Sequence, residues 1–110
     1  MEAMNLPEVV SELVKAQNRH DSIVYANCFA ETAVVVDEGQ TYNGRNEIEH
    51  WIKNANENYK IIMKPVRYTE TGLTGVLSAE VSGLFEGSPL VLQYHLVFID
   101  GFIQSLKVSI

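Results

Sequence analysis

Basic side chains are scarce in this chain of 110 residues. Eight Lys and Arg side chains stand against fourteen Asp and Glu, which gives a formal net charge of −6 at pH 7. The basic residues are also spread along the chain rather than gathered in one segment. A surface that binds nucleic acid needs the opposite charge balance, because it has to neutralise phosphates. We therefore expect no nucleic-acid partner.

Cysteine and long apolar runs are also nearly missing. Cys28 is the one cysteine, which excludes an internal disulfide and leaves the reducing cytosol as the default compartment. Because free cysteine is among the most buried residue types, we expect Cys28 to be a small apolar core residue. No apolar run has the length of a transmembrane helix, and "MEAMNLPEVV" lacks the pattern of a signal peptide. These features predict a cytoplasmic protein without membrane contact.

The composition that remains is that of an ordinary globular protein. Hydrophobic residues make up 46% of the chain and charged residues 20%, so there is enough apolar material for a packed core. The length fits one domain, and no linker, repeat or low-complexity stretch divides the chain. We therefore expect a single domain over residues 1–110.

Helical periodicity is confined to the first half of the chain. Between residues 6 and 14 the apolar positions follow the i, i+3, i+4, i+7 spacing of a helix with one buried face. A second, short helix is expected through "SIVYANCFA", with Asp21 or Ser22 as its cap. A third is expected after "YNG", with Asn46 as its cap and Trp51 and Ile52 on its apolar face.

The other segments have the composition of strands. "TAVVVDEG" is too short and too β-branched for a helix, and Gly39 ends it. After Tyr59 every segment is extended, with Pro65 indicating an edge strand or a bulge and with turns at "EGSP" and "DG". The order helix, helix, strand, helix and then strands predicts an α+β fold. Its helices would cover one face of a curved antiparallel sheet.

Four phrases stand in a fixed order along this pattern: "FAETAVVVDEG", "YNGRNEIEHWI", "GSP" and "YHLVFIDGFIQSLKV". Together with the element order, which extends from residue 6 to residue 110, they resemble the SnoaL-like and nuclear transport factor 2-like superfamily. Relatives in that superfamily include ketosteroid isomerases and polyketide cyclases. The resemblance implies a cystatin-like cone, in which a curved antiparallel sheet wraps around the N-terminal helices and encloses a central cavity.

The same resemblance implies a small, mostly apolar organic ligand in that cavity and a homodimer formed through the outer face of the sheet. It does not settle activity, because the superfamily holds isomerases, cyclases, dehydratases and members that only bind or dimerise. One interpretation is therefore a cofactor-independent isomerase, cyclase or dehydratase. The other is a non-catalytic dimerisation or ligand-binding module.

Asp37 and Tyr94 are the candidates for catalytic residues. On the ketosteroid isomerase pattern the general-base aspartate falls on Asp37, the oxyanion-binding tyrosine on Leu13 and the second aspartate on Tyr94. A partly desolvated carboxylate is suited to taking a proton from a carbon beside a carbonyl group. However, Leu13 cannot donate a hydrogen bond and Tyr94 replaces one of the two donors. These departures argue against steroid isomerisation by the known arrangement.

Each candidate also has a plainer interpretation. "DEG" can end a strand in solvent, which would leave Asp37 exposed. Tyr94 and its neighbour His95 must face opposite sides of a strand, so His95 would lie on the outer face, packed or hydrogen-bonded rather than catalytic. His20 and His50 are far apart and lack carboxylates at ligand spacing, so we expect no metal site. No sequence motif indicates a cofactor.

Five apolar or aromatic residues are expected to line the cavity: Leu13, Tyr25, Phe29, Tyr42 and Trp51. In such a site a few polar groups, Asp37 and Tyr94, would orient the ligand. The alternative is that these side chains are packed core, and it is favoured for Phe29 and Trp51 on the buried faces of their helices. The two roles overlap, because the wall of a cavity is also part of the core.

Overall fold

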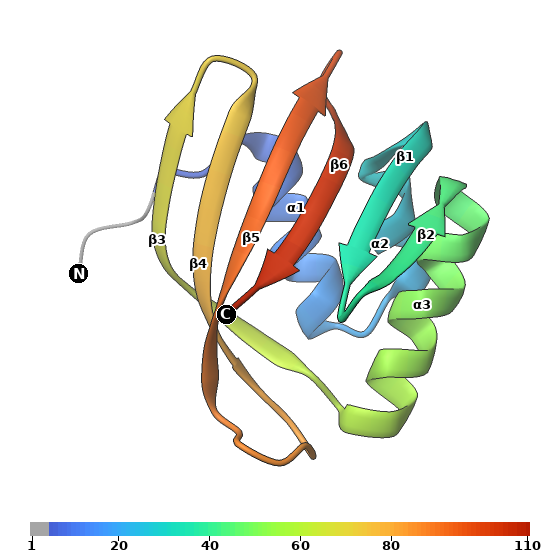
Figure 1. Ribbon diagram of the computed structural model, residues 1–110, viewed down its shortest axis with the longest axis vertical. Coiled ribbons are helices and arrows are strands. Elements are labelled where there is room, and N and C mark those ends of the chain that lie inside the picture. The colour runs from blue at the N-terminus through green and yellow to red at the C-terminus, as the bar shows by residue number, and fades with distance from the viewer. Residues whose placement is uncertain (1–4) are drawn as a thin grey trace.

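The computed structural model describes residues 5–110, which form three helices and one six-stranded sheet (Figure 1). The helices are α1 (Glu8–Asn18), α2 (Ser22–Asn27) and α3 (Gly44–Tyr59). The strands are β1 (Phe29–Asp37), β2 (Gln40–Asn43), β3 (Ile62–Thr71), β4 (Thr74–Ser82), β5 (Leu90–Ile99) and β6 (Phe102–Ser109). Within this described part, each helix falls short of the length and apolar character needed to cross a membrane.

The strand order in the sheet is β2-β1-β6-β5-β4-β3. Neighbouring strands are antiparallel except β1 and β6, which are parallel. The predicted α+β class with a curved antiparallel sheet is therefore confirmed, and the structure adds one parallel junction, between β1 and β6. The reason is the path of the chain. After β1, β2 and α3 it starts again at the far edge with β3 and returns by hairpins, so that β6 arrives beside β1 in the same direction.

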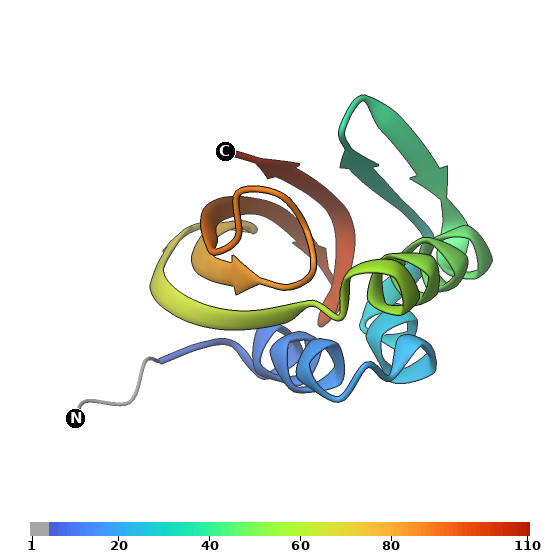
Figure 2. The same cartoon turned by 90° about the horizontal axis from the view of Figure 1, so that it is seen from below.

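Curvature of the sheet gives the molecule its conical shape. Figure 2 shows β3 to β6 curling above α1, while the β1–β2 hairpin lies beside α3 and is joined to β6 through β1. The register shifts between Pro65 and Arg67 in β3 and between Val97 and Phe98 in β5, and such bulges bend the strands that carry them. Pro65 thus lies on an edge strand and next to a bulge, and the sequence had indicated one or the other.

The first turns of α2 and α3 can be compared with the helix caps predicted from the sequence. The side chain of Asp21 accepts a hydrogen bond from the backbone N–H of Val24 at 3.1 Å, so Asp21 caps α2. Asn46 does not cap α3, because that helix already begins at Gly44. Its first turn is held instead by the Glu47 carboxylate, which accepts from the Asn43 N–H at 2.8 Å, as in half of a capping box.

The hydrophobic core lies between the helices and the concave face of the sheet. Val10, Leu13 and Val14 form the buried face of α1, and Leu77 and Leu96 face them from the sheet; all five are at most 9% exposed. Cys28 is buried in the same cluster. Side chains along β4 and β5 alternate between this buried face and an outer face, and Tyr94 and His95 lie on opposite sides of β5 as the sequence predicted.

Buried amide groups connect α1 to α3 and β3. Gln17 and Asn56 are 3% and 5% exposed, and the Gln17 Nε2 donates to Asn56 Oδ1 at 2.8 Å and to the Ile61 carbonyl at 3.1 Å. Beside them, Asn18 exchanges two hydrogen bonds with the backbone of Met63, at 2.9 and 2.8 Å. These contacts fix how α1 and α3 sit at the start of β3, close to the wide end of the cone.

Replacing Asn56 by Ala should leave the buried Gln17 amide without its side-chain acceptor. The cost of an unmet buried hydrogen bond is about 1 to 3 kcal/mol, so we expect a loss of that size in the free energy of unfolding. Lys53→Ala, at an exposed position of the same helix, should cost less than about 0.5 kcal/mol. Urea unfolding of both variants measures the difference, and equal midpoints would contradict this account.

Candidate functional site

A cavity of about 980 Å³ opens at the wide end of the cone. It lies between α3, the β1–β2 hairpin, the ends of β4, β5 and β6, and the loop between β4 and β5. Its wall is mainly aromatic and aliphatic, with Tyr25, Tyr42, Trp51, Ile52, Tyr59, Val81, Phe85, Leu92, Tyr94 and Val108 among the lining residues. A hollow of this size and character is what a small organic ligand requires.

The position of Asp37 follows from the alternation of β1. Ala33 and Val35 are fully buried on the inner face, and Asp37, two residues further on, lies on that same face and lines the cavity. Glu38 and Gly39 then form a two-residue hairpin turn, with φ of 52° and 76°, across which Asp37 pairs with Gln40. The phrase "DEG" is therefore a turn at its second and third residues only, and Glu38 is exposed as predicted.

The surroundings of Asp37 favour its neutral form. Burial raises the pKa of this carboxyl above its ordinary value, and the negative charge of Glu38 raises it further. The side-chain N–H of Trp51 and the backbone N–H of Glu38 act in the opposite direction, as hydrogen-bond donors to the carboxylate. Among the residues described at the cavity wall there is no Lys or Arg. The ionised carboxylate thus lacks a cationic partner.

Of the four tyrosines that line the cavity with Asp37, Tyr25 and Tyr94 have hydroxyl groups on which its charge acts. Burial raises the pKa of Tyr94, and the charge of Asp37 adds to that rise. Burial raises the pKa of Tyr25 as well, with further contributions from Tyr94, Cys28 and Asp37. Both hydroxyls are therefore protonated donors at neutral pH. Within the described residues, Tyr68 is the tyrosine whose hydroxyl donates to another side chain, Glu70, so the hydroxyls of Tyr25 and Tyr94 are free to donate to a ligand.

Trp51 is at the centre of the aromatic wall. Its ring stacks on that of Tyr42 with centroids 5.6 Å apart and lies 6.2 Å from that of Tyr25, which in turn is 5.7 Å from Phe29. Because Trp51 is the one tryptophan of the chain, its fluorescence reports on this cavity directly. The indole also reaches Asp37, which places aromatic surface and carboxylate side by side.

The structure brings together most of the residues that the sequence suggested, but not all of them. Asp37, Tyr94, Tyr25, Tyr42 and Trp51 line the cavity.

Leu13 and Phe29 do not line the cavity, since both are completely buried in the core. Phe29 packs behind Tyr25, which is the ring that reaches the cavity. Gln17, one helical turn after Leu13, is the α1 residue in the lining.

Several residues at the rim of the cavity were not predicted from the sequence. Tyr59 and Phe85 pack edge-on with centroids 6.4 Å apart, and Glu86 follows in the loop between β4 and β5. The sequence predicts that the strand continues through this segment, whereas β4 ends at Ser82 in the structure. Gly83 is the residue in the sequence that indicates the end of the strand. The chain needs a glycine there because an added Cβ would lie too close to the Tyr59 backbone carbonyl.

The histidines have separate environments. His20 hydrogen-bonds the Ile61 carbonyl at 2.7 Å, and His95 is exposed on the outer face with Ser109 at 3.0 Å. His50 is exposed and lies at the cavity rim. The described residues contain no group of three or more His, Cys, Asp or Glu side chains that could hold a metal ion.

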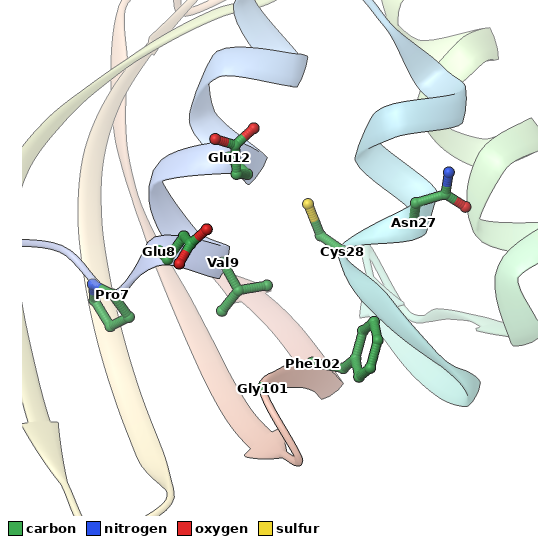
Figure 3. Close-up of a pocket in the computed structure, with 8 residues that line it drawn as sticks. All are labelled: Pro7, Glu8, Val9, Glu12, Asn27, Cys28, Gly101 and Phe102. Carbon is green, nitrogen blue, oxygen red and sulfur yellow. The ribbon is translucent and has the colours of Figure 1, made fainter.

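A smaller hollow of about 460 Å³ lies at the opposite side of α2 from the cavity wall, between α1 and the β5–β6 turn. Figure 3 shows the sulfur of Cys28 in it, pointing toward α1. Burial, and after it the charge of Glu12, raises the pKa of this thiol to about 11, and the Cys28 Sγ donates to the Val24 carbonyl at 3.5 Å. A thiol in that state is a poor nucleophile.

Comparison with known proteins supports the fold. A putative polyketide cyclase from Sinorhizobium meliloti has 32% sequence identity and a TM-score of 0.93, with 99% of this chain and 100% of that one covered. A protein from Catenulispora acidiphila with a ketosteroid isomerase-like fold, solved in complex with trimethylamine, has 19% identity and a TM-score of 0.87. The match covers 96% of this chain and 87% of that one.

A nuclear transport factor 2-like protein of unknown function from Cytophaga hutchinsonii has 15% identity and a TM-score of 0.79 over 99% of this chain and 93% of its own. The chain matches no protein-family model. No curated protein matches it either. The chain belongs to the SnoaL-like and nuclear transport factor 2-like superfamily, as its sequence phrases had suggested.

Two substitutions should move the pKa of Asp37 in opposite directions. Trp51→Phe removes a donor to the carboxylate and should raise the pKa further, whereas Glu38→Gln removes the nearby negative charge and should lower it toward its ordinary value. The side-chain carboxyl carbon of Asp37, followed by NMR during a pH titration, measures both shifts. A pKa that moves in the same direction in the two variants would disprove this assignment of causes.

Proposed function

We propose that this protein binds a small, mostly apolar organic molecule in the cavity and acts on it as a cofactor-independent isomerase, cyclase or dehydratase. The observation that supports this most directly is the position of Asp37, a carboxyl group of raised pKa on the inner wall of a largely aromatic cavity. A base whose pKa lies closer to neutrality than that of an ordinary aspartate is better matched to proton abstraction from carbon.

In the proposed mechanism Asp37 takes a proton from the carbon beside a carbonyl group of the ligand. Negative charge then develops on the carbonyl oxygen, where the hydroxyl of Tyr94 donates a hydrogen bond. Tyr25 supplies the second donor that Leu13 cannot provide, because it lines the same cavity and is near enough to Asp37 for the carboxylate charge to act on its hydroxyl. Asp37 returns the proton to another atom of the ligand, so no cofactor is consumed.

The proton abstraction can be tested without knowing the natural substrate. Cyclic ketones such as 2-tetralone are incubated with the protein in D₂O, and NMR follows deuterium entering the carbon next to the carbonyl. We expect the protein to accelerate exchange, and Asp37→Asn to reduce that acceleration by at least about 100-fold. Asp100→Asn, in the exposed β5–β6 turn, is the matched control and should leave the rate unchanged.

The same experiment separates the two interpretations of the chain. Ketones that quench the fluorescence of Trp51 but exchange no deuterium would identify a binding module without catalysis. Small-molecule binding has a precedent among proteins of this fold in the trimethylamine complex of the Catenulispora acidiphila protein. Exchange that persists undiminished in Asp37→Asn would remove Asp37 from the mechanism.

We also propose that two copies of the chain associate through the outer face of the sheet. Val91 and Val97 of β5 lie on that face and are 46% and 38% exposed, on either side of His95. Exposed apolar side chains gathered on a sheet face are typical of an interaction surface. The helices, by contrast, leave this face uncovered (Figure 2).

Val97→Lys should therefore shift the protein from dimer to monomer, because a charge would be buried in the interface without a partner. Light scattering coupled to size-exclusion chromatography measures the mass. Ile23→Lys, at an exposed position of α2 on the helical side of the molecule, is the control and should keep the dimer. A wild-type protein that is monomeric at every accessible concentration would rule out this interface.

A further inference from the structure

All strongly charged side chains described at the cavity wall are acidic. Asp37 and Glu38 come from the β1–β2 hairpin, Glu47 from α3 and Glu86 from the β4–β5 loop. The wall contains no Lys or Arg among its described residues, and His50 is the basic group at the rim. Carboxylates from three separate elements thus converge on one opening, which disfavours an anionic ligand through repulsion.

The wall next to Asp37 is built from aromatic rings. Trp51 hydrogen-bonds the carboxylate, while Tyr25 and Tyr94 are close enough for its charge to act on their hydroxyls. The face of an aromatic ring is negative and attracts cations, tryptophan most strongly. An apolar neutral ligand would gain from the rings alone, but it would leave the partly buried carboxylate of Asp37 without a positive partner.

Asp37 is the least exposed of the four carboxylates and therefore gains most from a positively charged partner. It lies on the inner face of the sheet, and the one salt bridge among the described residues joins Lys15 to Glu12, both on α1. Charges removed from water are normally paired. No side chain of the cavity wall described in this structure supplies the positive charge, so a ligand is the natural source of it.

We infer that the ligand of this cavity carries a substituted ammonium group, held against the ring of Trp51 with Asp37 as its counter-ion. The apolar part of such a ligand would contact the aliphatic wall formed by residues such as Leu92 and Val108. This inference rests on the proposed function, since it concerns the same cavity, and it adds the charge of the ligand.

Choline and 3,3-dimethylbutan-1-ol test the charge directly, because they have nearly the same shape and differ in a quaternary nitrogen against a carbon. Titration at constant ionic strength, followed by the fluorescence of Trp51 and by calorimetry, gives the two dissociation constants. We expect choline to bind about tenfold more tightly. In Asp37→Asn the preference should fall to about twofold or less, whereas Asp100→Asn should retain it in full.

The outcomes distinguish this inference from the proposed function. The wild-type comparison of the two ligands needs no variant, so it remains decisive even if Asp37→Asn folds poorly. Equal or tighter binding of the neutral alcohol would overturn the inference and leave the proposed function standing. A choline preference that survives in Asp37→Asn would overturn the counter-ion role of Asp37. Failure of these ligands and of the cyclic ketones alike to bind would instead contradict the proposed function.

Discussion

The parallel pairing of β1 with β6 is the contact on which the cavity depends. It joins the β1–β2 hairpin to the four-stranded meander, and it aligns Val35 with Leu106 on the concave face. Tyr94 pairs with Val108 on the next strand over, so Asp37 and Tyr94 come to the same end of the same face. Without this junction the hairpin and α3 would have no fixed position relative to β5. The carboxylate and the phenol would then belong to separate surfaces.

Local signals in the sequence were sufficient for much of the fold. Asp21 at the start of α2, Pro65 on the edge strand and the Asp100–Gly101 turn were all identified correctly, because each acts on backbone geometry within a few residues. The errors concern longer distances. A strand of four residues, Gln40–Asn43, has too few positions to show periodicity, and it exists because β1 offers it a partner. Nothing in a local pattern shows that β6 will lie parallel to β1.

The same difference between local and long-range effects applies to the candidate site. The resemblance pointed to Asp37 as a cavity residue, while the sequence itself left open a solvent-exposed turn; in the structure Asp37 lies on the inner face, two residues after Val35. A sequence pattern shows which face of a helix is buried but not how deep a residue lies, so Leu13 and Phe29 were assigned to the cavity together with Tyr25, although Tyr25 and Gln17 are the residues that reach it. The acidic rim was also unpredictable, because Glu38, Glu47 and Glu86 are brought together by the packing of three elements that are distant in the chain. Membership of the superfamily establishes the scaffold, and the chemistry of the cavity depends on the residues that line it.

The raised pKa of Asp37 also couples the site to folding. Because the folded chain holds this proton more tightly than the unfolded chain does, the stabilising contribution of the protonated carboxyl is complete below the pKa of the unfolded state. That contribution is lost as the pH rises through the higher pKa of the folded state. Ionisation of Asp37 in the empty cavity therefore lowers the stability of the fold, although partial contact with water keeps the penalty small. The carboxylate that the proposed chemistry needs thus comes at a cost in folding stability.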